Sequence, residues 1–239
     1  MRSKQSGFTL VEIAIVLVII GLLLGGVLKG QELINSAKIK NVANDLNGIS
    51  TAVYAYQDRF KALPGDDLSA GGATGRWTTS FSGNGNTTIE GAFNADAAAL
   101  VFAAGTAETL KFWQHLRLAG FVGGDPNTGQ PINAVGGITG VQSGAGNQTV
   151  ATDGTQGLAG LVVCQTNILG KIAESLDNQL DDGRANGGAV RSWTQTALVG
   201  ADGATTGVDI SVGATGKPSP AVTYVDDGNT MYTVCKKVT

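Results

Sequence analysis

The chain has 239 residues and a formal net charge of −3, and its basic residues form no block. This length allows one anchored domain, or two small ones, with a sizeable core. Phosphate neutralisation needs clustered lysine and arginine, so the charge pattern argues against nucleic acid as the main partner. Of the 36 glycines, 30 follow residue 63, which predicts a C-terminal region rich in turns and irregular loops.

A short basic leader, residues 1–7, precedes an apolar run from Phe8 to Leu28. As a helix this run is roughly 31 Å long, enough to cross a bilayer. The basic leader favours a cytoplasmic N-terminus, and the run lacks the small-x-small cleavage site that follows a secretory signal. Glu12 is the single charge in the run, and a charge in hydrocarbon needs a partner. We expect no partner within the run itself, only an α-amino group created by cleavage before Phe8.

The segment Gly7–Glu12, with the sequence GFTLVE, resembles the processing and methylation motif of type IV prepilins and type II secretion pseudopilins. The resemblance covers residues 1–30. It implies that a prepilin peptidase cuts after Gly7 and methylates the new N-terminal Phe8, and that Glu12 is the family's glutamate at the fifth mature position. One departure is that the late helical proline of many major pilins is missing. Instead, any of Gly21, Gly25, Gly26 and Gly30 could let the helix stretch or locally melt.

After Lys29 the pattern becomes that of an amphipathic helix. Apolar residues recur at spacings of three and four, so they lie on one face of the helix. This stripe consists of Val42, Leu46, Ile49, Val53, Tyr56 and Phe60. Pro64 predicts that the helix ends near Lys61 or Ala62. The stripe could form a coiled-coil seam with another subunit or pack beneath the chain's own globular domain. We favour the second interpretation, because only three heptads are available.

The rest of the chain is predicted to form a head of short elements. We expect a loop over 64–91 with a tight turn at Asn84-Gly85, a helix over 106–119 that stops at Gly120, and irregular chain over 123–157. A buried strand at 158–164 and a helix over 167–181 follow. The last expected strands are 189–193, 208–212, 221–225 and 231–235, and a hairpin turn at 226–229 joins the final two. This is an α+β arrangement, which the resemblance to pilins also implies.

Cys164 and Cys235 are the only cysteines. Outside the cytoplasm, two thiols in one domain usually pair, and the alternative is two buried free thiols. A bridge would attach the last strand to the strand that ends at Cys164. Such a bridge resembles the disulfide-bounded region of many type IV pilins.

Other candidate chemistry in the head is sparse. His115 has no second histidine with which to form a zinc pair, so a structural role is expected. No catalytic or phosphate-binding motif occurs, so we expect neither an enzyme nor a cofactor. Calcium, which some pseudopilins bind, could be held by either of two acidic groups, but neither matches an EF-hand loop, and Asp-Asp-Gly also suits a helix stop or a hairpin turn. These groups are Asp177/Asp181/Asp182 and Asp226/Asp227.

The resemblance implies a structural filament subunit with four parts: leader 1–7, transmembrane and filament-core helix 8–30, amphipathic stalk 31–62, and head 64–239. Its expected partners are copies of itself and related pilins, prepilin peptidase, the inner-membrane assembly platform, and lipid before assembly. The precursor would lie in the bacterial inner membrane with its N-terminus in the cytoplasm. After assembly the subunit would belong to a periplasmic or cell-surface filament.

In this hypothesis the amine of Phe8 and the carboxylate of Glu12 face each other across neighbouring subunits and set their axial register, because each charge is costly alone in a low dielectric. Two alternatives stay open. One is a pseudopilin of a type II secretion system, and the other is a minor pilin whose head binds a surface or a secreted substrate. An anchored enzyme has the least support.

Overall fold

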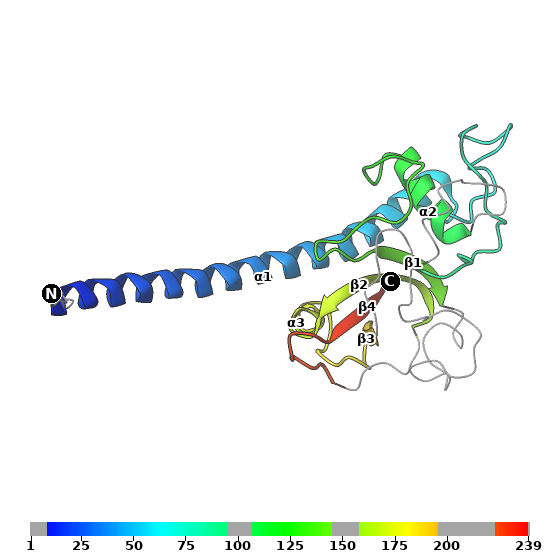
Figure 1. The fold of residues 1–239 in the computed structure, drawn as a ribbon. Helices are drawn as coiled ribbons and strands as arrows, with labels where there is room; N and C mark the ends of the chain where they lie inside the picture. The colour runs from blue at the N-terminus through cyan, green and yellow to red at the C-terminus, as the bar shows by residue number, and fades with distance from the viewer. Residues whose placement is uncertain (1–8, 95–106, 145–157, 196–222, 239) are drawn as a thin grey trace, which may run out of the picture. The chain divides into compact units, whose positions relative to one another are not determined.

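The computed structural model of the protein describes residues 9–94, 107–144, 158–195 and 223–238 (Figure 1). In chain order its elements are α1 (Leu10–Phe60), α2 (Glu108–Leu118), β1 (Thr139–Gly144), β2 (Gly160–Leu169), α3 (Gly170–Leu180), β3 (Val190–Gln195) and β4 (Met231–Lys237). The chain divides into two compact units, 1–38 and 39–239, and α1 contributes to both. The predicted α+β fold is confirmed.

The first unit contains the apolar part of α1. Every large apolar side chain from Leu10 to Leu28 is exposed, from 45% at Ile20 to 88% at Leu10. An exposed ion pair between Lys29 and Glu32, 2.7 Å from Nζ to Oε2, follows the end of the apolar run. By length and composition α1 could cross a membrane, and a bilayer would cover these exposed side chains.

The second unit contains the rest of α1, which provides one side of the hydrophobic core. The predicted stripe is buried at Val42, Leu46, Ile49, Val53 and Tyr56, and Phe60 is partly buried. The stripe therefore packs within the chain's own globular domain, as favoured from the sequence. The helix ends at Phe60, and Lys61 adopts a left-handed conformation with a φ of 55° while its N–H bonds to the carbonyl of Gln57.

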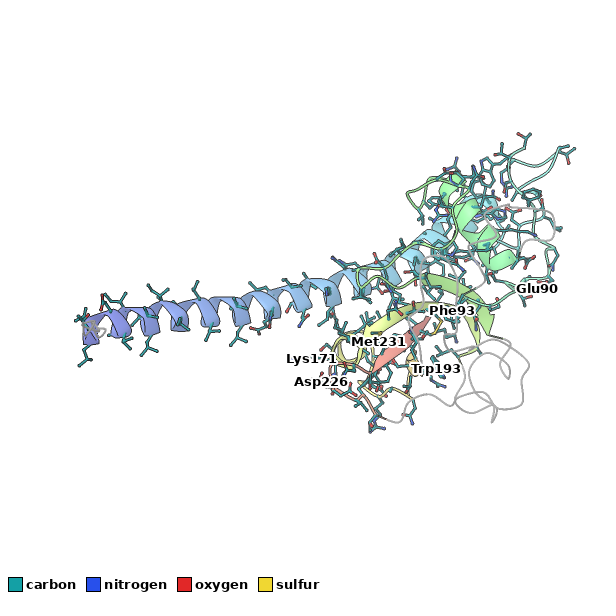
Figure 2. The ribbon with its side chains drawn as sticks, in the orientation of Figure 1. Glu90, Phe93, Lys171, Trp193, Asp226 and Met231 are labelled. Carbon is teal, nitrogen blue, oxygen red and sulfur yellow. A yellow bond between two sulfur atoms is a disulfide. The ribbon has the colours of Figure 1, made fainter. Side chains whose placement is uncertain are left out.

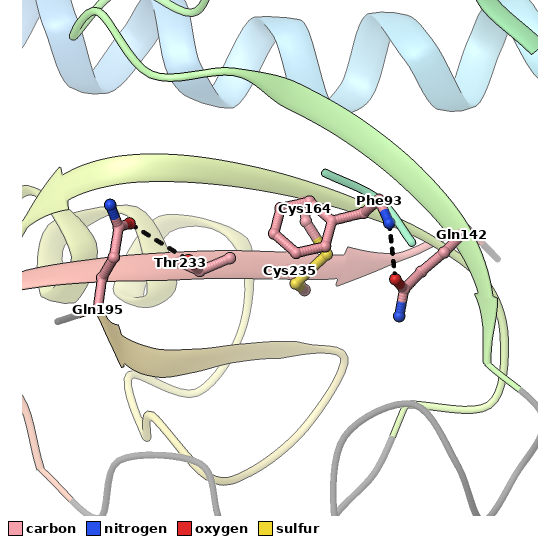
Figure 3. The surroundings of a disulfide bond; sticks show 6 residues. All are labelled: Phe93, Gln142, Cys164, Gln195, Thr233 and Cys235. Atoms are coloured by element: carbon pink, nitrogen blue, oxygen red, sulfur yellow. Dashed lines mark hydrogen bonds between the residues drawn. A yellow bond between two sulfur atoms is a disulfide. The ribbon is translucent and has the colours of Figure 1, made fainter. Parts of the chain in front are cut away.

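The sheet has the strand order β1-β2-β4-β3, and all neighbours are antiparallel. The two central strands place Cys164 directly opposite Cys235, with their Cα atoms 4.0 Å apart, and a disulfide joins them (Figure 3). Both cysteines are fully buried in a small cluster with Phe93 and Trp193. The bridge thus attaches the C-terminal strand to the strand through Cys164, as the sequence predicted.

The first departure from the predicted elements is β1, which lies in the region that was expected to be irregular. Its sequence, TGVQSG, contains two glycines and a single large apolar residue, which hides the strand pattern. Gly140 is required by packing, because a Cβ atom there would lie 1.9 Å from the carbonyl oxygen of Phe93. Phe93 also donates its N–H to the side chain of Gln142, 2.9 Å away (Figure 3). The absence of a side chain at Gly140 therefore permits the backbone at Phe93 to lie against the sheet.

The second departure is the length of β2, which runs past Cys164 to Leu169. The strand is irregular between Gln165 and Ile168, where Asn167 has a φ of 61°. Because the strand continues, α3 begins at Gly170 and not at the predicted residue 167.

The predicted final hairpin is wrong where the structure describes it. Residues 223–225 form no strand, and β4 pairs with β2 and β3 instead. The ring of Tyr224 packs against Tyr232 with centroids 5.4 Å apart, and its hydroxyl donates to Asp177 over 2.6 Å. These two contacts of Tyr224 hold residues 223–225 against α3, so this segment does not join the sheet. The predicted strand 208–212 lies outside the described residues.

The predictions for the end of α2 and for the loop over 64–91 are confirmed. The sequence predicted that α2 would stop at Gly120, which has a φ of 78°. The N–H of Gly120 bonds to the carbonyl of Arg117, and the N–H of Phe121 bonds to the carbonyl of Leu116. These two bonds form the Schellman pattern. Residues 64–91 are irregular, and Gly85 takes a positive φ of 75°.

Candidate processing and assembly site

The N-terminus of α1 is closed by a reciprocal pair of residues. The backbone N–H and the hydroxyl of Thr9 both donate to Oε2 of Glu12, each over 2.8 Å. The N–H of Glu12 donates back to the hydroxyl oxygen of Thr9 over 3.3 Å. The carbonyl of Thr9 accepts the first helical bond, from Ile13, so Thr9 is the N-cap residue. This is a capping box, which satisfies two of the free N–H groups of a helix end.

The capping box corrects the expectation that Glu12 has no partner within the apolar run. Thr9 is uncharged, but it offers two donors to the carboxylate. The sequence contained the signal, because Thr9-Leu10-Val11-Glu12 follows the Ser/Thr-x-x-Glu pattern of a capping box. Charge alone predicts a cation as the partner of Glu12, whereas the observed partner is a hydroxyl.

One oxygen of Glu12 stays available. Among the residues that the structure describes, no group donates to Oε1, since Thr9 uses Oε2 for both bonds. Gly7 and Phe8, the predicted processing residues, lie outside the described residues. The site thus consists of a carboxylate with one oxygen fixed in its own helix and one open to a further donor.

The basic leader, the exposed apolar helix and the carboxylate in its first turn together form an N-terminal signature. Residues 2–28 match the prokaryotic N-terminal methylation motif. This methylation motif is the signature of type IV pilins and pseudopilins. No curated protein and no solved structure matches the chain. The chain therefore carries the signature of a pilin-like filament subunit, and its apolar helix fits a membrane-anchored precursor.

Outside the methylation motif, His115 has the structural environment predicted for it. The ring is fully buried, and Nδ1 accepts the N–H of Gly65 over 2.9 Å. Because Nδ1 is an acceptor, Nε2 carries the proton and donates to the carbonyl of Phe81, also over 2.9 Å. Burial lowers the pKa of His115 to about 4. The neutral ring joins two points of the 64–91 loop to α2.

Two buried aspartates of that loop were not singled out from the sequence. Asp67 accepts bonds from the hydroxyl of Tyr56 and the N–H of Ser69, each over 2.8 Å, and pairs with Arg76. Burial raises the pKa of Tyr56 to about 12, so it stays a donor. Asp66 accepts the N–H groups of residues 85, 86 and 87. From the sequence, Pro64-Gly65-Asp66-Asp67 predicted only the start of a long loop, because the partners of the two aspartates are set by tertiary packing.

The carboxylates proposed for calcium make contacts that close turns. The structure brings oxygens of Asp177, Asp181 and Asp182 within 4.8 Å of one another. Asp181 accepts the N–H groups of residues 189 and 190, and Asp182 accepts that of residue 184. Desolvation raises the pKa of Asp177. In the second group, bonds from the backbone of residues 229 and 230 lower the pKa of Asp227 to about 2. Calcium binding stays a hypothesis.

Proposed function

We propose that the protein is a structural subunit of a type IV pilus-like filament and not an enzyme. The observation that carries the proposal is the methylation motif over residues 2–28, with Glu12 in the first turn of an exposed apolar helix. In this proposal prepilin peptidase removes residues 1–7, and Phe8 becomes the methylated N-terminus. Residues 8–30 anchor the precursor in the inner membrane and later form the filament core, residues 31–62 form the stalk, and residues 64–239 form the head.

The chemistry of assembly in this proposal centres on Glu12. The capping box leaves Oε1 of Glu12 without a described donor, and the amine of Phe8 in a neighbouring subunit supplies one. Inside a core of packed apolar helices this attraction is strong, and either charge alone would be costly. The pair would then fix the axial register of one subunit on the next. Copies of the chain, related pilins and the inner-membrane assembly platform are its partners.

The first test is the purification of filaments sheared from cells that produce the chain. Mass spectrometry should find a chain that begins at N-methylated Phe8, abundant enough to be a major subunit. Gly7→Ala should accumulate as the uncleaved precursor, and mature methylated protein from that variant would contradict the proposal. Glu12→Val should be cleaved and methylated normally but should be absent from filaments.

The same preparation distinguishes the alternatives. A minor pilin with a binding head would be rare in the filaments, and a pseudopilin whose fibre stays in the periplasm would be missing from the material sheared off the cell surface. The irregular segment 64–91 is the described part of the head on which a binding role would be sought.

A further inference from the structure

A cleft of about 290 Å³ opens in the second unit, between α1 and the chain that follows α2. Most of the side chains that line it are apolar, among them Trp113, Phe121 and Ile132. Ile132 is 62% exposed, so part of the cleft wall is open to solvent. The volume is at the lower end of small-molecule pockets, so it suits a side chain better than a cofactor.

Gly48 lies in the interior of α1 and lines this cleft. Glycine in a helix interior is destabilising relative to alanine, so it usually has a packing reason. Here a Cβ atom would meet nothing within 4 Å, in contrast to Gly140, where it would meet a backbone carbonyl. No contact inside the described chain therefore requires glycine at position 48. The space that it leaves is available to a group from outside the chain.

An exposed carboxylate stands at the edge of the cleft. Asp45 lines it, and no described residue forms an ion pair with this carboxylate or donates a hydrogen bond to it. Desolvation raises the pKa of Asp45, and a neighbouring cation would reverse that effect.

We propose that this cleft receives a lysine side chain from a second copy of the chain in the filament. The aliphatic stem would lie along Phe121 and Ile132, and the ammonium group would reach Asp45, a division that suits lysine. The chain supplies such cations, because Lys40 and Lys171 are exposed and make no ion pair with a described residue. The inference rests on the proposed function, which brings copies together.

The first experiment fills the cleft without harming the fold. Gly48→Leu in the full chain should give severalfold less filament per cell, because the leucine side chain would fill the space that the interface anchor needs. In detergent its unfolding temperature should be no lower than that of the wild type, because leucine favours the helix and meets open space. Thr51→Leu, exposed on the same helix outside the cleft, should assemble normally.

The second experiment identifies the occupant and does not depend on how Gly48→Leu folds. A water-soluble carbodiimide should join Asp45 to a lysine of another copy in wild-type filaments, and mass spectrometry should find that link in the dimer. Isosteric Asp45→Asn should lose the link and assemble poorly. Normal filaments from Asp45→Asn, or dimers without an Asp45–lysine link, would overturn this inference but leave the proposed function intact. A wild-type chain that forms no filaments would overturn the proposed function, and this inference with it.

Discussion

The hydroxyl of Thr9 and the carboxylate of Glu12 bind each other across the first turn of α1, with 2.8 Å between Oγ1 and Oε2. The only charge of the apolar run is therefore held by its own helix before any second subunit arrives. In hydrocarbon, unsatisfied N–H groups and an unpaired carboxylate are both costly, and the capping box reduces both costs. The same contact fixes the carboxylate in one orientation.

Replacing Thr9 by valine, which has the same shape, should weaken this end of the helix. The variant loses the hydroxyl donor to Glu12 and the acceptor for the N–H of Glu12, and loss of an N-cap costs about 1 kcal/mol. We expect normal cleavage and methylation by mass spectrometry, with a severalfold lower yield of sheared filaments. Thr9→Ser keeps both contacts and should behave as the wild type. An unchanged yield from the valine variant would show that the hydroxyl has no role.

Asp67 should be the most sensitive position of the 64–91 loop. Asp67→Ala leaves the buried hydroxyl of Tyr56 without its acceptor and Arg76 without its ion pair, and removing one partner of a buried pair costs about 3 kcal/mol. Thermal unfolding in detergent should show a clear loss of stability. The control is Asp58→Ala, whose ion pair with Lys61 is exposed on both sides and should contribute little. Equal losses in the two variants would contradict this account.

The disulfide should stabilise the head strongly. It spans a sequence separation of 71 residues, and the chain-entropy model gives about 4 kcal/mol for a loop of that length. The double variant Cys164→Ala/Cys235→Ala should therefore unfold at a much lower temperature. In the folded wild type, both sulfurs are buried, so mild reductants should leave the bond intact until the head opens. A rapid reaction with reductant under native conditions would contradict that expectation.

The parts of the fold that the sequence predicts well are those in which one local signal dominates. The stripe from Val42 to Tyr56, the stop at Gly120 and the strand at Cys235 each follow from spacing or from a single residue with a strong preference. The disulfide followed from the number of cysteines and the predicted export of the head.

The parts that were missed depend on contacts between distant segments. Gly140 looks like a loop residue until the carbonyl of Phe93 is found against it. Tyr224 looks like a strand residue until its hydroxyl is found on Asp177. At the candidate site, the methylation motif predicts Glu12, whereas its partner Thr9 follows from the capping-box pattern and not from charge. Local sequence patterns do not contain the contacts of Gly140 and Tyr224 with distant residues. The capping box of Thr9 and Glu12, in contrast, could be predicted from the sequence.

The buried imidazole of His115 should make the stability of the head depend on pH. Burial lowers its pKa to about 4 from 6.5, so the unfolded chain binds a proton at a higher pH than the folded chain does. The contribution of the neutral ring is therefore complete above pH 6.5 and is lost as the pH falls towards 4. The difference corresponds to roughly 3 kcal/mol across that window.

Unfolding by denaturant in detergent at a series of pH values between 7 and 4 would measure this effect. The control is His115→Asn, which keeps an acceptor for the N–H of Gly65 but cannot titrate. Burial raises the pKa values of Glu108 and Asp177, so these two carboxyls favour the folded state as the pH falls, but they are present in both proteins. The difference between the two curves thus isolates His115. Parallel curves would show that the ring is protonated in the folded head without cost, and that the two backbone bonds do not hold it neutral.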